Sequence, residues 1–277
     1  MCGFSIVILT LNEEINIRAC IESVPWCDDI VVLDSCSTDR TVDIAKECGA
    51  RVYQNKFEDF GQQRNFALDF IDFKYDWLFH LDADERFNDM LKRECETKIA
   101  LNLHSAYWVP NRIIFLGKWI PRCTQYPYPQ VRLIKIGEVR FAKAGHGQKE
   151  DQVLRGIGSI DTPYDHYNFS KGINAWLEKH IHYASEEAEL SISLARQPFK
   201  WKEIFSANPL IRRRAQKRLH VVLPFRWLCK FLYLYVLRMG FLDGVVGFNY
   251  CMMIMFYDFL ITLKIKELRR KRDNLPI

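Results

Sequence analysis

The chain has 277 residues, of which 49% are hydrophobic and 14% aromatic, enough for one large domain or one domain with an appendage. This composition excludes an intrinsically disordered protein. The nine cysteines form no C-x-x-C pairs and no zinc-site spacing with histidines, which indicates reduced thiols rather than disulfides or structural zinc. The N-terminus has no basic region ahead of a long apolar run, so we expect no signal peptide.

The net charge of +5 is unevenly distributed. Residues 199–277 carry 16 Lys and Arg against 5 Asp and Glu, a net charge of +11, which leaves −6 on the rest of the chain. Regions of opposite charge indicate different partners. We therefore predict a folded domain over residues 1–195 and a basic, hydrophobic helical region over residues 196–277.

Four short runs early in the chain are typical of strands: residues 5–10, 29–34, 51–54 and 77–82. The first, second and fourth are apolar without alternation, as in the buried strands of a parallel sheet. The segments between the runs carry apolar residues at helical spacing, and Pro25 and Gly49 end two of these helices. The alternation predicts an α/β fold with a mostly parallel sheet flanked by helices.

Polar residues stand at the carboxyl ends of three of these strands: Asn12 and Glu13, then Asp34, then Asp82 and Asp84. Ligands of open α/β sheets bind outside the carboxyl ends of the strands, so these residues predict a shared site. The alternative is that they cap helices or form turns. No G-x-G-x-x-G follows a strand and no P-loop is present, which excludes a dinucleotide site and a P-loop nucleotidase.

The sequence Asp82-Ala83-Asp84 is the strongest of these signals. Two carboxylates spaced in this way suit Mg²⁺ or Mn²⁺ bound to a diphosphate, because hard cations prefer carboxylate and phosphate oxygens. The alternative is a solvated loop that leads into an acidic helix start.

Three segments, each at a strand end, together resemble family 2 glycosyltransferases: Ile6 to Glu14, Val32 to Thr41, and Asp82 to Glu85. The resemblance covers roughly residues 4–190. It implies a GT-A fold, which is Rossmann-like, and a reaction that inverts the anomeric centre. The residues that it assigns to the nucleotide-sugar are Thr10, Asn12, Glu13, Asp34, Arg64, Asp82 and Asp84. The Asp34-Ser35 pair, where the family usually has Asp-Asp-Gly-Ser, resembles the branch that adds sugars to the lipopolysaccharide core.

An inverting reaction needs a carboxylate to accept the proton of the acceptor hydroxyl. Related sequences have a His-Glu pair where this chain has His146-Gly147, so the resemblance does not supply the base. The nearest acids, Glu150 and Asp151, are our candidates, followed by Asp161 and Asp165. His146 is a candidate third metal ligand beside Asp84 and Asp82, because neutral imidazole binds Mn²⁺; the alternative is a structural histidine. Arg132 is a candidate for phosphate or acceptor contact, or else a surface arginine.

Residues 199–238 carry ten Lys and Arg and one acid, interleaved with aromatic and aliphatic residues, which is typical of a basic helix on an anionic membrane. The high apolar content and the lack of a recognisable module argue against nucleic acid. Residues 241–263 are long enough to span a bilayer, but Asp243, Asn249 and Asp258 make spanning costly. We expect a peripheral or re-entrant helical hairpin there, with a transmembrane helix or a buried core or homodimer helix as alternatives.

The sequence thus predicts a metal-dependent (Mn²⁺ or Mg²⁺) inverting glycosyltransferase that uses a nucleotide-sugar, in particular a UDP-sugar. The expected acceptor is a lipid-linked glycan or lipopolysaccharide-type molecule at the cytoplasmic face of the bacterial inner membrane. One alternative, a sugar-nucleotide pyrophosphorylase, requires a glycine-rich basic loop after the first strand, where this chain has Leu11-Asn12-Glu13-Glu14. The other alternative is a membrane-bound nucleotide-sugar-binding scaffold with a degenerate site.

Overall fold

The computed structural model describes residues 3–124, 126–144, 147–195, 201–206, 212, 215, 218–221 and 223–277. The chain divides into two compact units. Unit 1 comprises Met1–Pro121 and Tyr126–Lys171, and unit 2 comprises Arg122–Gln125 and Gly172–Ile277. The helix that ends at residue 195 therefore belongs to the second unit, and our functional division into 1–195 and 196–277 stays a prediction.

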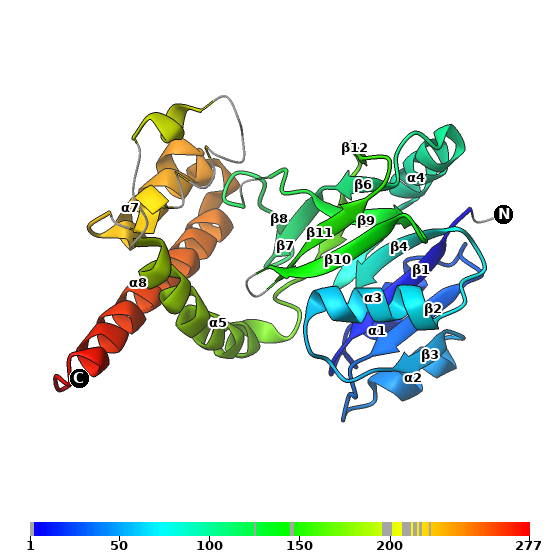
Figure 1. Cartoon of the computed structure of the whole chain (residues 1–277), viewed down its shortest axis with the longest axis horizontal. Coiled ribbons are helices and arrows are strands. Elements are labelled where there is room, and N and C mark those ends of the chain that lie inside the picture. The colour runs from blue at the N-terminus through cyan, green and yellow to red at the C-terminus, as the bar shows by residue number, and fades with distance from the viewer. Residues whose placement is uncertain are drawn as a thin grey trace. The chain divides into compact units, whose positions relative to one another are not determined.

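Unit 1 is built on a seven-stranded sheet with the order β12-β6-β9-β4-β1-β2-β3 (Figure 1). Its strands are β1 (Ser5–Thr10), β2 (Ile30–Asp34), β3 (Arg51–Gln54), β4 (Trp77–Asp82), β6 (Ala106–Val109), β9 (Gln130–Lys135) and β12 (Ile157–Ser159). Neighbouring strands are parallel except that β9 pairs antiparallel with both β4 and β6. The predicted mostly parallel α/β sheet is confirmed.

Helices cover both faces of this sheet. Successive side chains of β1 point to opposite faces, and both sets contain apolar residues. Ile6 and Ile8 enter a core shared with α1 (Ile17–Glu22), α2 (Thr41–Glu47) and α4 (Asp89–Leu101). Val7, between them, enters a second core shared with α3 (Phe60–Phe70). Both sides of the strand are buried, which explains why the strand sequence shows no polar alternation.

Two smaller β structures complete unit 1. The strands β10 (Val139–Ala144) and β11 (Gly147–Val153) form an antiparallel pair, and β10 packs on α3. A four-stranded sheet has the order β5-β13-β7-β8, with β5 (Glu85–Arg86), β13 (Tyr164–His166), β7 (Asn111–Phe115) and β8 (Lys118–Trp119). Its β5–β13 pairing sets His166 opposite Glu85, so a residue far along the chain reaches the acidic segment that follows β4.

Unit 2 is helical: α5 (Gly172–Ala195), η1 (Trp201–Phe205), α7 (Arg226–Leu232), η2 (Tyr233–Leu237), η3 (Gly240–Asp243) and α8 (Gly244–Arg272). The long helix α8, drawn in orange and red in Figure 1, packs against α5 and α7. Since α8 is continuous through residue 263, the helical hairpin that we expected over residues 241–263 is wrong. Among the described residues, the helix Gly240–Arg272 is long and apolar enough to cross a membrane.

The acids that we expected to make membrane spanning costly are paired within unit 2. The Asp243 carboxylate accepts hydrogen bonds from the backbone N–H groups of Arg122 and Cys123, both at 3.0 Å. Asp258 accepts hydrogen bonds from Arg226, with Nη2 at 2.8 Å and Nε at 3.1 Å. Both acids are buried, so they face the interior of the unit rather than the surroundings of α8.

Candidate active site

The carboxyl ends of β1, β2 and β4 meet at one edge of the sheet, because these strands are parallel neighbours. Their register sets Thr10 beside Asp34 and Leu9 beside Asp82. The hydroxyl of Thr10 donates a hydrogen bond to Asp34 at 3.0 Å. The strand-end residues that we predicted from sequence are therefore brought together.

The loops after β1 and β2 are interlocked by their own polar groups. The backbone N–H of Asn12 donates to the Ser37 hydroxyl at 2.8 Å, and the backbone N–H of Thr38 donates to the Asn12 side-chain oxygen at 2.8 Å. Asp34 accepts from the Ser37 backbone N–H at 2.8 Å. Asn12 holds a positive φ of 54°, which asparagine tolerates. Asn12 and Asp34 thus hold together the two loops at this edge of the sheet. Their contact with a nucleotide stays a prediction.

Glu13 is held between two partners. Its carboxylate lies 2.5 Å from the Lys171 ammonium and accepts a hydrogen bond from the Asn16 side chain at 2.7 Å. Burial raises the pKa of Glu13 above its usual value, although Asn16 and Lys171 act in the opposite direction. These contacts fasten the loop after β1 to the segment that leaves β13.

Arg132 on β9 joins the acids at the end of β4. Its Nη2 donates to Asp82 at 2.8 Å and to Glu85 at 2.5 Å, and Glu85 also accepts the backbone N–H of Asp82 at 2.9 Å. Arg132 is 1% exposed and Glu85 is fully buried. Arg132 is therefore not the surface arginine that we considered as the alternative. Burial raises the pKa of Glu85 to about 7, whereas Arg132 and Arg64 outweigh burial and hold the pKa of Asp82 well below its usual range.

Asp84 has a different partner from Asp82. The Nε2 atom of His166 lies 3.3 Å from the Asp84 carboxylate, and both side chains are partly exposed. Burial lowers the pKa of His166, but Asp84 and the neighbouring acids more than offset this and raise it to about 9. The partly exposed Asp84 carboxylate is a ligand suited to Mn²⁺ or Mg²⁺, and a neutral imidazole beside it is a further ligand for Mn²⁺.

The described residues do not complete the metal site that we predicted. Our third candidate ligand, His146, is not among the described residues. Within the described ranges no group of three or more His, Cys, Asp and Glu is placed to hold a metal ion. Sequence reasoning did not give His166 a role, and only the β5–β13 pairing brings it to Asp84.

Behind Asp82 lies a cluster of buried nitrogen atoms on Arg64, Arg132 and His80. Within the described part of the chain, Nε and Nη1 of Arg64, Nη1 of Arg132 and both ring nitrogens of His80 have no hydrogen-bond partner. Burial, and then Arg132, lower the pKa of Arg64 to about 10. Burial, followed by the two arginines, lowers the pKa of His80 well below its usual value, which keeps it neutral. The positive charge behind Asp82 therefore comes from the two guanidinium groups.

The two candidate bases lie on β11. Glu150 is half-buried and stands opposite Phe141 of β10, whereas a register shift leaves exposed Asp151 without an opposite residue. The ring of Phe141 lies 5.5 Å from the Arg64 guanidinium and 5.6 Å from the His80 ring. Directly opposite residues of an antiparallel pair share a face, so Glu150 lies on the face of the hairpin that contacts the buried cluster.

Comparison with known proteins supports a common family. Residues 5–126 match the profile of Glycosyl transferase family 2. The chain is 28% identical over 287 residues to an uncharacterized glycosyltransferase of Rickettsia typhi, covering 99% of this chain and 90% of the relative. It is 30% identical over 143 residues to the lipopolysaccharide core biosynthesis glycosyltransferase LpsC of Rhizobium meliloti, covering 50% of this chain and 52% of LpsC.

Solved structures are more distantly similar. The structure of S. aureus TarS 1–349 in complex with UDP-GlcNAc has a TM-score of 0.45 and 14% identity, covering 98% of this chain and 92% of that chain. Glucosyl-3-phosphoglycerate synthase from Mycobacterium tuberculosis, in complex with Mn²⁺, UDP-glucose and phosphoglyceric acid, has a TM-score of 0.43 and 19% identity, covering 60% of this chain and 71% of that chain.

The Arg132 bridge gives a stability prediction. Arg132→Met should lower the free energy of unfolding by about 3–5 kcal/mol, because it leaves two carboxylates at the end of β4 without their buried partner. Adding Glu85→Gln should restore part of the loss by removing one of those carboxylates. Arg140→Met is the matched control, since its pair with Asp69 is exposed and should contribute about 0–1 kcal/mol. Urea unfolding followed by circular dichroism measures all variants, and equal losses for the two arginines would contradict the prediction.

Proposed function

We propose that the chain is a family 2 glycosyltransferase of the GT-A type, which transfers a sugar from a UDP-sugar to a lipid-linked glycan or lipopolysaccharide-type acceptor with inversion; the match of residues 5–126 to that family's profile supports this proposal. The observation that carries this proposal is the meeting of the three strand-end motifs at one sheet edge, with the Asp84–His166 pair beside them. The lipopolysaccharide-type acceptor follows the printed name of LpsC.

In the proposed donor site, Asp84 and His166 hold the divalent cation, with Asp82 close by and His146 as a further candidate. When bound, Mn²⁺ or Mg²⁺ would offset the negative charge of the leaving diphosphate. Arg132 takes up the charge of Asp82 and Glu85, which fixes the turn that presents Asp84. Thr10, Asn12, Glu13 and Asp34 form the adjacent edge, where we place the nucleoside, and Arg64 lies behind it.

We propose Glu150 as the base that accepts the proton of the acceptor hydroxyl. It is preferred to Asp151 because it shares a hairpin face with Phe141, which contacts Arg64 and His80. Asp165 is a weaker alternative, since Nε of Arg112 already binds its carboxylate at 2.6 Å.

The proposed lipid-linked acceptor is supported by the surface of α8. Six large apolar side chains on this helix are exposed or nearly so: Val245, Phe248, Met252, Phe256, Phe259 and Leu263. Their spacing of three and four residues puts them on one stripe of the helix. The buried residues of α8, among them Cys251, Ile261 and Ile265, lie on the opposite face. An apolar stripe that ends near Arg269, Arg270, Lys271 and Arg272 fits a helix lying on an anionic membrane, which we place at the cytoplasmic face of the bacterial inner membrane.

The donor site is tested by calorimetric titration of UDP with and without Mn²⁺. We expect Mn²⁺ to tighten UDP binding in the wild type and Asp84→Asn to remove that gain. Asp89→Asn, an exposed acid in the first turn of α4, is the control and should behave as the wild type. Mn²⁺-dependent binding that persists in Asp84→Asn would contradict the metal assignment. UDP binding without any sugar transfer would instead support the scaffold alternative.

The base is tested once a donor and acceptor pair has been found by screening UDP-sugars against lipopolysaccharide core acceptors. Glu150→Gln should lower kcat by about 10²–10⁴-fold, the usual contribution of a general base, and should leave UDP binding unchanged. Asp151→Asn should remain within a few-fold of the wild type. The opposite ranking, measured as initial rates of UDP release, would overturn the choice of Glu150.

Membrane binding is tested by co-sedimentation with vesicles that contain phosphatidylglycerol. Phe256→Glu, in the middle of the exposed stripe, should strongly reduce the bound fraction, because it sets a charge where apolar surface would enter the headgroup region. Met90→Glu, at an exposed apolar position on α4, should have no effect. If the stripe instead packs against a second copy of the chain, Phe256→Glu would change the oligomeric state and leave vesicle binding intact.

A further inference from the structure

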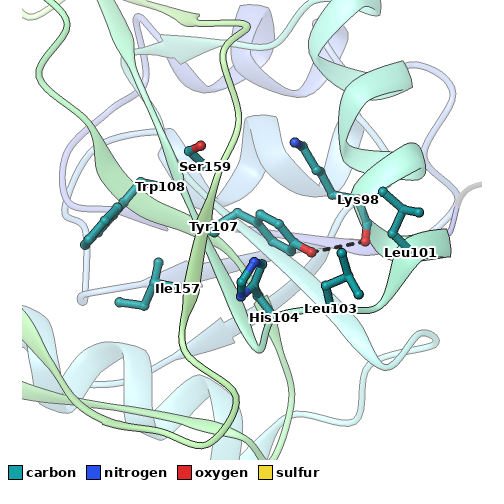
Figure 2. Close-up of a pocket in the computed structure, with 9 residues that line it drawn as sticks. Lys98, Leu101, Leu103, His104, Tyr107, Trp108, Ile157 and Ser159 are labelled. Atoms are coloured by element: carbon teal, nitrogen blue, oxygen red, sulfur yellow. Dashed lines mark hydrogen bonds between the residues drawn. The ribbon is translucent and has the colours of Figure 1, made fainter.

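Unit 1 also contains a hollow that is separate from the candidate active site at the ends of β1, β2 and β4. It has a volume of about 300 Å³ and is bordered by β6, β12 and the end of α4 (Figure 2). The strands β6 and β12 run in the same direction as β4, since β6 and β4 are both antiparallel to β9. The hollow lies beside β12, the edge strand of the sheet, whereas Asp82 ends β4, which is three strands away in the sheet order. The two sites are therefore separate.

Two consecutive residues of β6 line this hollow, with Tyr107 buried and Trp108 42% exposed. Gly158 of β12 stands opposite Tyr107. A Cβ at Gly158 would lie 2.6 Å from the rings of both His104 and Tyr107, so only glycine lets these rings lie against the strand.

The lining combines aromatic faces with hydrogen-bonding groups. Figure 2 shows Tyr107 at the centre, with Trp108 on one side and Lys98 and Leu101 on the other. The Tyr107 hydroxyl donates to the backbone oxygen of Lys98 at 3.2 Å, which closes the floor. The Lys98 ammonium and the Ser159 hydroxyl border the hollow as possible ligand contacts. Small-molecule pockets have this character, with apolar and aromatic walls and a few polar groups.

We propose that this hollow is a second carbohydrate-binding site, which holds a saccharide unit of the acceptor glycan far from the bond that is formed. A sugar ring offers an apolar face for Trp108 and hydroxyl groups for Lys98 and Ser159. A purely apolar ligand would make no use of these polar groups. An added protein strand is disfavoured because the edge strand β12 has only three residues. The choice of ligand rests on the proposed function, but binding itself requires neither donor nor metal.

The test is a glycan array of bacterial oligosaccharides probed with the full chain, followed by calorimetry of the best-bound glycan. We expect Trp108→Ala to weaken its Kd at least about tenfold, or about 1.4 kcal/mol, through loss of the stacking face. Gly158→Val should weaken it similarly by displacing the His104 and Tyr107 rings. Arg140→Met, an exposed change on β10 outside the hollow, should bind the glycan as the wild type does.

Trp108 is exposed, so its variant keeps the test valid if Gly158→Val does not fold; circular dichroism checks both. Absence of glycan binding by the wild type, or equal binding by wild type and Trp108→Ala, would overturn the proposal. Failure of the proposed transferase function would be a separate result, in which the wild type binds the glycan but shows no Mn²⁺-dependent binding of UDP.

Discussion

The arrangement of the acidic edge depends on one buried guanidinium, that of Arg132. It contacts Asp82 and Glu85 together, and its removal would leave the fully buried Glu85 without its cationic partner. Glu85 in turn accepts the backbone N–H of Asp82 and so fixes the turn that follows β4. This bridge is supplied by β9, the single antiparallel strand of the main sheet, which lies directly beside β4.

The bridge makes the two aspartates of the Asp-x-Asp sequence unequal. Asp82 is compensated by arginine, and its pKa is held low by the guanidinium groups of Arg132 and Arg64. Asp84 instead contacts His166, an ionisable group that can exchange its proton for a cation. Both side chains are partly exposed, so the difference between the two aspartates lies in their partners, and this difference is why we propose Asp84 as the metal ligand.

In unit 2, the long helix α8 carries apolar residues on two opposite faces. One side packs against α5 through Ile261 and Ile265, and it contains Asp258 paired with Arg226. The other side presents the stripe that includes Phe256. A helix with apolar residues on opposite faces has two surfaces to cover, and the unit itself covers one. The remaining surface is the observation on which our proposal of membrane binding rests.

Much of the first unit was determined by the sequence itself. Unbroken apolar runs are explained by burial on both faces, and the parallel order of β1, β2 and β4 brings Thr10, Asp34 and Asp82 to one edge, as predicted. The long helix at the C-terminus was visible as an apolar stretch, but its unbroken course was not, because residues 241–263 contain acids whose partners lie elsewhere in the chain.

Tertiary structure alone decided the partners of the acids. Arg132 and His166 are about 50 and 80 residues from the aspartates they contact, on strands whose pairing no local pattern specifies. The hollow beside β12 likewise depends on the close approach of Gly158 to the rings of His104 and Tyr107, which the pairing of β12 with β6 sets. Hydrophobic periodicity fixes which face of a strand is buried, whereas register between distant strands fixes which charges meet, and register exists only in the folded chain.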